Sequence, residues 1–105
     1  MNDIASRLAD VRSKLITAVE AVEDDAGASP VLVAVVREFD AKLAKAEARA
    51  NAANGDSAVR EGVVEAEQAA DSAKAAAEAD PAVGGEARQA VLDAHYAICV
   101  LKAEM

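Results

Sequence analysis

Residues 4–22 read IASRLADVRSKLITAVEAV, and their apolar side chains return every three or four residues. The repeat consists of Ile4, Leu8, Val11, Leu15, Ala18 and Val22. Because an α-helix completes a turn every 3.6 residues, this spacing places all six side chains on one face. We therefore predict an amphipathic helix over about residues 2–25, with its apolar face packed against other helices.

Three further stripes with the same spacing follow along the chain. They predict helices at about residues 30–53 and 57–79, and a last helix that begins at 82 or 86 and ends near 104. The stripes consist of Leu32, Val36, Phe39, Leu43, Ala46, Ala50 and Ala53; of Val59, Val63, Ala66, Ala70, Ala73 and Ala77; and of Ala87, Val91, Ala94, Ile98, Leu101 and Met105.

The breaks between the stripes carry residues that are typical of helix ends. Gly27 can take the left-handed position that closes a helix. Ser29 is expected to cap the second helix, with Pro30 at its first position. Asp56–Ser57 offers a cap for the third helix. Pro81 ends the third helix, because the residue before a proline avoids the α region, and is also a candidate to open the fourth.

Short loops between long helices make sequential neighbours antiparallel. The predicted fold is therefore all-α, a four-helix antiparallel bundle with up-down-up-down topology, as one domain over residues 1–105. Two alternatives stay open: a three-helix bundle with a detached arm, and a helical hairpin completed by a second chain.

Composition restricts the function. The 105 residues include 29 alanines and no tryptophan, and Phe39 and Tyr96 are the aromatic residues, so a stacking platform for bases is excluded. The net charge is −8, and residues 55–105 hold ten acidic and four basic residues. Such a surface repels nucleic acid and anionic lipid and favours a basic protein partner.

The sequence also predicts a cytoplasmic protein. The first residues are charged where a secretory signal would be apolar, and the longest uncharged stretch, residues 26–36, is too short to span a membrane. A single cysteine, Cys99, cannot form an internal disulfide.

The fourth predicted helix is apolar on the side opposite its core stripe as well, where Leu92, Tyr96, Cys99 and Val100 lie. Val31 and Val35 give the start of the second helix the same character. A helix that is apolar all round needs more neighbours than a thin bundle supplies. We predict that these six residues form an interface, most simply of a homodimer. The alternative is an irregular bundle with the fourth helix at its centre.

His95 and Cys99 stand four residues apart, the spacing of a metal-ligand pair on one helical face. Carboxylates from another helix would have to complete such a site. The acidic residues of the third helix are instead expected on a solvated surface: Glu61, Glu65, Glu67, Asp71 and Glu78. We therefore predict no metal and no cofactor, and keep His95 and Cys99 as weak metal candidates.

No catalytic residues are predicted. The size and helical architecture resemble histidine phosphotransfer domains, but Tyr96 follows His95 where that family has a lysine. The run Leu92-Asp93-Ala94-His95-Tyr96 resembles five residues of the all-helical chorismate mutases. That resemblance implies polar side chains converging on a dianionic substrate, and the nominees are Arg12, Lys42, Arg49 and Gln89.

The predicted function is therefore a small acidic module for protein–protein interaction, such as an adaptor, an assembly factor or an inhibitor. The alternative is a small helical enzyme or metal-binding protein centred on His95 and Cys99.

Overall fold

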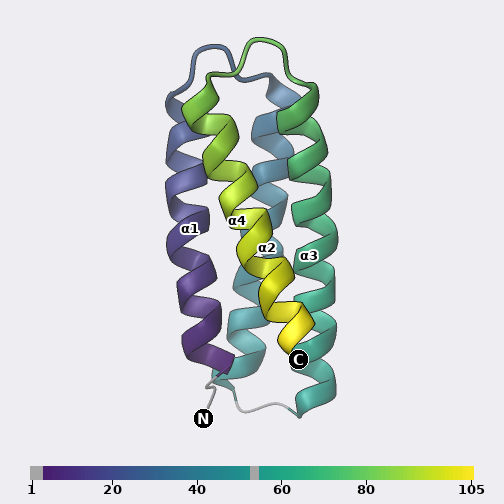
Figure 1. Ribbon diagram of the computed structural model, residues 1–105. Coiled ribbons are helices and arrows are strands. Elements are labelled where there is room, and N and C mark those ends of the chain that lie inside the picture. The colour runs from purple at the N-terminus through teal and green to yellow at the C-terminus, as the bar shows by residue number, and fades with distance from the viewer. Residues whose placement is uncertain (1–3, 53–54) are drawn as a thin grey trace.

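The computed structural model describes residues 4–52 and 55–105, and these residues form the four predicted helices. They are α1 (Ile4–Asp24), α2 (Pro30–Asn51), α3 (Asp56–Ala79) and α4 (Gly85–Glu104). The helices run alternately up and down in a bundle that measures 42 × 21 × 20 Å (Figure 1). The predicted helical residues 2–3 and 53 lie outside the described residues.

Each helix packs on the helix before and after it, and α4 closes the bundle against α1. In Figure 1, α4 therefore lies in front and α2 behind it, diagonally across the core. This arrangement matches the predicted antiparallel bundle. Among the described helices, none combines the length and the apolar character that a membrane crossing requires.

The four predicted stripes form the core. Phe39 and the leucines at positions 8, 15, 32 and 43 are almost completely buried, and every member of the α3 stripe is buried. The stripes are less covered at their ends, where Ile4 and Ala50 are half-buried and Met105 is exposed. Ala53 lies outside the described residues. The helical spacing of apolar residues thus identified the core. Residues three or four apart lie on the same face of a helix, and that face is the one that packs against the other helices.

The predicted residues at the helix ends are confirmed in part. Ser29 caps α2, since its Oγ accepts a hydrogen bond from the Leu32 N–H at 3.1 Å, and Pro30 is the first helical residue. Asp80 is extended (φ −80°, ψ 111°) and ends α3 before the proline. Neither Asp56 nor Ser57 caps α3, because the helix already begins at Asp56 and its N-cap is Gly55.

Pro81 does not open α4, which begins at Gly85, so the later of the two predicted starts, residue 86, is correct within one residue. The prediction for Gly27 is wrong. Gly27 is not in the left-handed region; a Cβ there would lie 2.0 Å from the carbonyl oxygen of Ala82. Glycine is therefore needed at position 27 for a close approach between the α1–α2 loop and the α3–α4 loop.

Hydrogen bonds join these two loops, which lie together at one end of the bundle (Figure 1). The Asp80 carboxylate accepts from the backbone N–H of Ser29 at 2.8 Å and of Ala82 at 3.0 Å. The Asp25 carboxylate accepts from the Gly84 N–H at 2.8 Å. Because Asp80 and Ser29 belong to different helical hairpins, this network connects the two halves of the molecule.

Candidate functional site on helix α4

The outer face of α4 is the first candidate site, and its residues differ in exposure. Tyr96 is 71% exposed, whereas Leu92, Cys99 and Val100 are half-buried. The neighbouring helices explain the difference: Val100 lines a groove beside α1, and Cys99 lies on the side of α4 that faces α3. The apolar surface is thus narrower than the sequence indicated and is centred on Tyr96.

Val31 and Val35 lie elsewhere. Their helical spacing places them on the same flank of α2 as Lys42 and Arg49, which pair with Glu65 of α3. Since α2 is diagonally opposite α4, these two valines cannot join Tyr96 in one continuous surface, although Val31 is 65% exposed.

The second candidate site is a cluster where α3 and α4 meet. His95 Nε2 lies 2.7 Å from Asp71 Oδ1, and Cys99 Sγ lies 3.5 Å from His95 Nε2. One ligand atom from each of the three side chains lies within 4.8 Å of the others. His95 and Cys99 are half-buried and Asp71 is exposed, so the cluster opens to solvent on the Asp71 side.

An ion pair between α3 and α4 lies next to this cluster. Lys102 Nζ donates to Glu67 Oε1 at 2.9 Å, and that hydrogen bond raises the pKa of Lys102. Partial burial, followed by the negative charges of Glu67 and Asp71, raises the pKa of the Cys99 thiol. Since the thiolate is the reactive form, Cys99 in these surroundings is a poor nucleophile at neutral pH.

The sequence analysis assigned Asp71 and Glu67 to a solvated surface and so missed this cluster. A usable signal was present. In an antiparallel hairpin, residues equidistant from the turn face each other across the two helices. Asp71 and His95 lie twelve residues before and after Val83, and Glu67 and Cys99 lie sixteen residues before and after it.

The residues nominated from the resemblance to chorismate mutases do not converge on a pocket. Arg12 pairs with Glu47 at 2.7 Å between α1 and α2. Lys42 and Arg49 lie near Glu65, between α2 and α3, and Gln89 donates to Asp93 within α4. The four side chains are thus divided among different parts of the bundle and have carboxylate partners within the chain.

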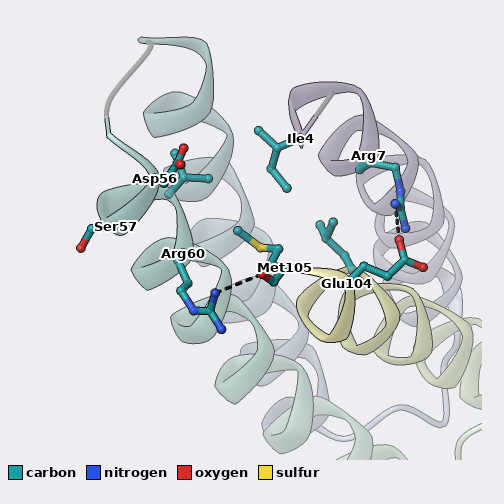
Figure 2. Close-up of a pocket in the computed structure, with 9 residues that line it drawn as sticks. Ile4, Arg7, Asp56, Ser57, Arg60, Glu104 and Met105 are labelled. Carbon is teal, nitrogen blue, oxygen red and sulfur yellow. Dashed lines mark hydrogen bonds and ion pairs between the residues drawn. The ribbon is translucent and has the colours of Figure 1, made fainter. Parts of the chain in front are cut away.

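A pocket of about 370 Å³ lies at the end of the bundle opposite the linked loops, between the start of α1, the start of α3 and the end of α4 (Figure 2). Its two arginines have partners within the chain. Arg7 pairs with Glu104, and Arg60 donates to the Met105 carbonyl at 3.2 Å. Each guanidinium group at this pocket thus already has a hydrogen-bond partner within the chain.

Comparison with protein-family models, with curated proteins and with solved structures gives no match to this chain, so its function is argued from its own residues.

Proposed function

We propose that this protein is a protein–protein interaction module that self-associates through the outer face of α4. The observation that carries the proposal is Tyr96, which at 71% exposure is the most exposed large apolar residue in the described part of the chain. An aromatic ring with a polar tip is a typical anchor of protein interfaces, since the ring buries apolar area while the hydroxyl stays hydrated.

The spacing around Tyr96 supports a helix as the partner. Leu92, Tyr96, Cys99 and Ala103 follow steps of four, three and four residues, which form a second seam opposite the core stripe. Charge supports it as well. Among residues 92–100, Asp93 is the one Asp, Glu, Lys or Arg, in a chain with a net charge of −8. Two such segments can therefore approach with less repulsion than the rest of the surface would cause.

Symmetry favours a second copy of this chain as the occupant. Leu92 and Val100 lie four residues before and after Tyr96. In an antiparallel pair of α4 helices with a two-fold axis at Tyr96, Leu92 packs on the partner's Val100, and the two contacts are identical. A single helix pair buries less than the roughly 1,200 Å² of a standard interface, so we expect a concentration-dependent dimer.

The test is the mass in solution by light scattering, at two protein concentrations that differ about tenfold, the higher one favouring the dimer. We expect the mass to approach twice the 10.7 kDa of the chain at the higher concentration. Tyr96→Glu should remain monomeric at both concentrations, because it places an unpaired charge in the interface. Val31→Glu is the matched control, an exposed valine on another side of the bundle, and should behave like the unaltered protein.

A monomeric wild-type protein at both concentrations would contradict self-association. So would an unchanged mass for Tyr96→Glu with its helical content intact. In the first case the same face is the place to look for a different partner, and the acidic second half of the chain favours a basic one.

A further inference from the structure

The cluster of Asp71, His95 and Cys99 brings three kinds of metal ligand together from two helices. α4 supplies an imidazole and a thiol four residues apart, and α3 supplies a carboxylate from across the seam. Carboxylate, imidazole and thiolate together form a donor set of the kind that binds Zn²⁺ in proteins.

We infer that Asp71, His95 and Cys99 form a binding site for a single Zn²⁺ ion, with a fourth coordination position open to water. The inference does not rest on the proposed self-association, since it uses the seam between α3 and α4 and not the exposed ring of Tyr96; the two proposals share Cys99.

One of the three distances between ligand atoms already suits this assignment, and the one between Asp71 and Cys99 is at most 4.8 Å. Ligand atoms at roughly 2.0–2.3 Å around a tetrahedral Zn²⁺ lie roughly 3.3–3.8 Å from one another. Cys99 Sγ and His95 Nε2 are already 3.5 Å apart. The 2.7 Å between His95 Nε2 and Asp71 Oδ1 is a hydrogen-bond distance that must widen. Asp71 can move to widen it, because its side chain is 60% exposed whereas that of His95 is 17% exposed.

The residues next to the cluster leave its own ligands available. Glu67 lies one turn before Asp71 on α3 and is paired with Lys102 at 2.9 Å, so Lys102 does not need Asp71 as a partner. Direct coordination to Zn²⁺ stabilises a thiolate, so Cys99 would bind the ion as its thiolate. Zinc uptake should therefore displace the thiol proton and lock α3 to α4.

The experiment uses the full chain and two probes. Co²⁺ reports the ligands by absorption, because a bound thiolate gives a charge-transfer band in the near ultraviolet and tetrahedral Co²⁺ gives intense visible bands. Zn²⁺ affinity is then measured by competition with a chromophoric chelator. The site variants are Asp71→Asn, His95→Gln and Cys99→Ser. The control is Asp93→Asn, which removes the same charge from the far flank of α4, where Asp93 accepts from Gln89.

We expect one Co²⁺ per chain with the charge-transfer band, displaced by Zn²⁺. Each site variant should bind Zn²⁺ at least about tenfold more weakly, whereas Asp93→Asn should match the unaltered protein. At the same concentration, Zn²⁺ should raise the Tm of the unaltered protein and of Asp93→Asn more than that of the site variants, and circular dichroism without metal verifies that each variant is folded.

Four results would overturn the inference. They are no stoichiometric metal, Co²⁺ bound without a thiolate band, Zn²⁺ affinity unchanged in any folded site variant, and a molecular mass that doubles when Zn²⁺ is added. The last result would place the metal between two chains instead of between α3 and α4 of one chain.

Discussion

Gly27 is the residue at which the fold tolerates a side chain least. A Cβ there would lie 2.0 Å from the Ala82 carbonyl oxygen and 2.8 Å from its carbon, and backbone atoms cannot swing aside as a flexible side chain can. We expect Gly27→Ala to lower the free energy of unfolding by about 1–3 kcal/mol through overpacking. Urea denaturation measures the change.

The matched control for Gly27→Ala is Gly85→Ala, where an added Cβ meets nothing within 4 Å. That substitution should leave stability unchanged or raise it slightly, since alanine favours the helix. Equal effects at both positions would mean that the contact between the loops contributes nothing.

Gly27 and Asp71 show where residue-level prediction stops. The sequence predicted a helix end just before Gly27, and α1 does end at Asp24, but the reason for glycine at position 27 is a loop more than fifty residues further along the chain. His95 and Cys99 were selected by spacing within one helix, whereas Asp71 required the register between two. Patterns within one helix do not show which residues of two helices face each other. That alignment is found only by counting residues outwards from the turn that joins them.

At the scale of helices, α2 and α3 approach each other closely at Gly62. A Cβ added at Gly62 would lie 3.1 Å from Cα and 3.2 Å from Cβ of Ala46, so small residues face each other here. Gly62→Leu should separate the helices and lower the free energy of unfolding by about 1–3 kcal/mol, although leucine is intrinsically the better helix former. Glu61→Leu, one residue earlier and exposed, should stay within about 0.5 kcal/mol of the unaltered protein.

Chemical denaturation of the two leucine variants, with circular dichroism to compare their helical content, measures this difference. A Gly62→Leu protein as stable as Glu61→Leu would show that the seam between α2 and α3 is loosely packed.

The helices themselves were predictable because their apolar spacing, the Ser29 cap and the break at Pro81 are local signals. How exposed each side chain of α4 is could not be predicted from the sequence, because it depends on which neighbouring helix covers each side of α4.

At the scale of the molecule, Asp80 links the two helical hairpins and makes their association depend on pH. Hydrogen bonds from the backbone of Ser29, and then of Ala82, lower the pKa of its carboxyl. A lowered folded pKa stabilises the fold above the unfolded value of about 3.9, and this contribution is lost as the pH falls through the folded value. Asp80→Asn should therefore be less stable than the unaltered protein at neutral pH.

The difference between the two proteins should shrink as the pH falls below the unfolded pKa of about 3.9, because the unaltered carboxyl then becomes protonated in the folded state as well. Urea denaturation across that range measures it. Glu61→Gln, which removes the same charge from an exposed side chain of α3, serves as the charge control. A stability gap for Asp80→Asn that is independent of pH would rule out the charged carboxylate as the cause.

The bond between the Ser29 amide and Asp80 also makes a single loop proton a reporter of large-scale opening. Loop amides normally exchange with deuterium through small local fluctuations. The Ser29 proton is held instead by a buried side chain from the other hairpin, and its exposure to solvent requires the two hairpins to part at that end. Its exchange rate would record how often the bundle divides into halves, while both halves keep their helices.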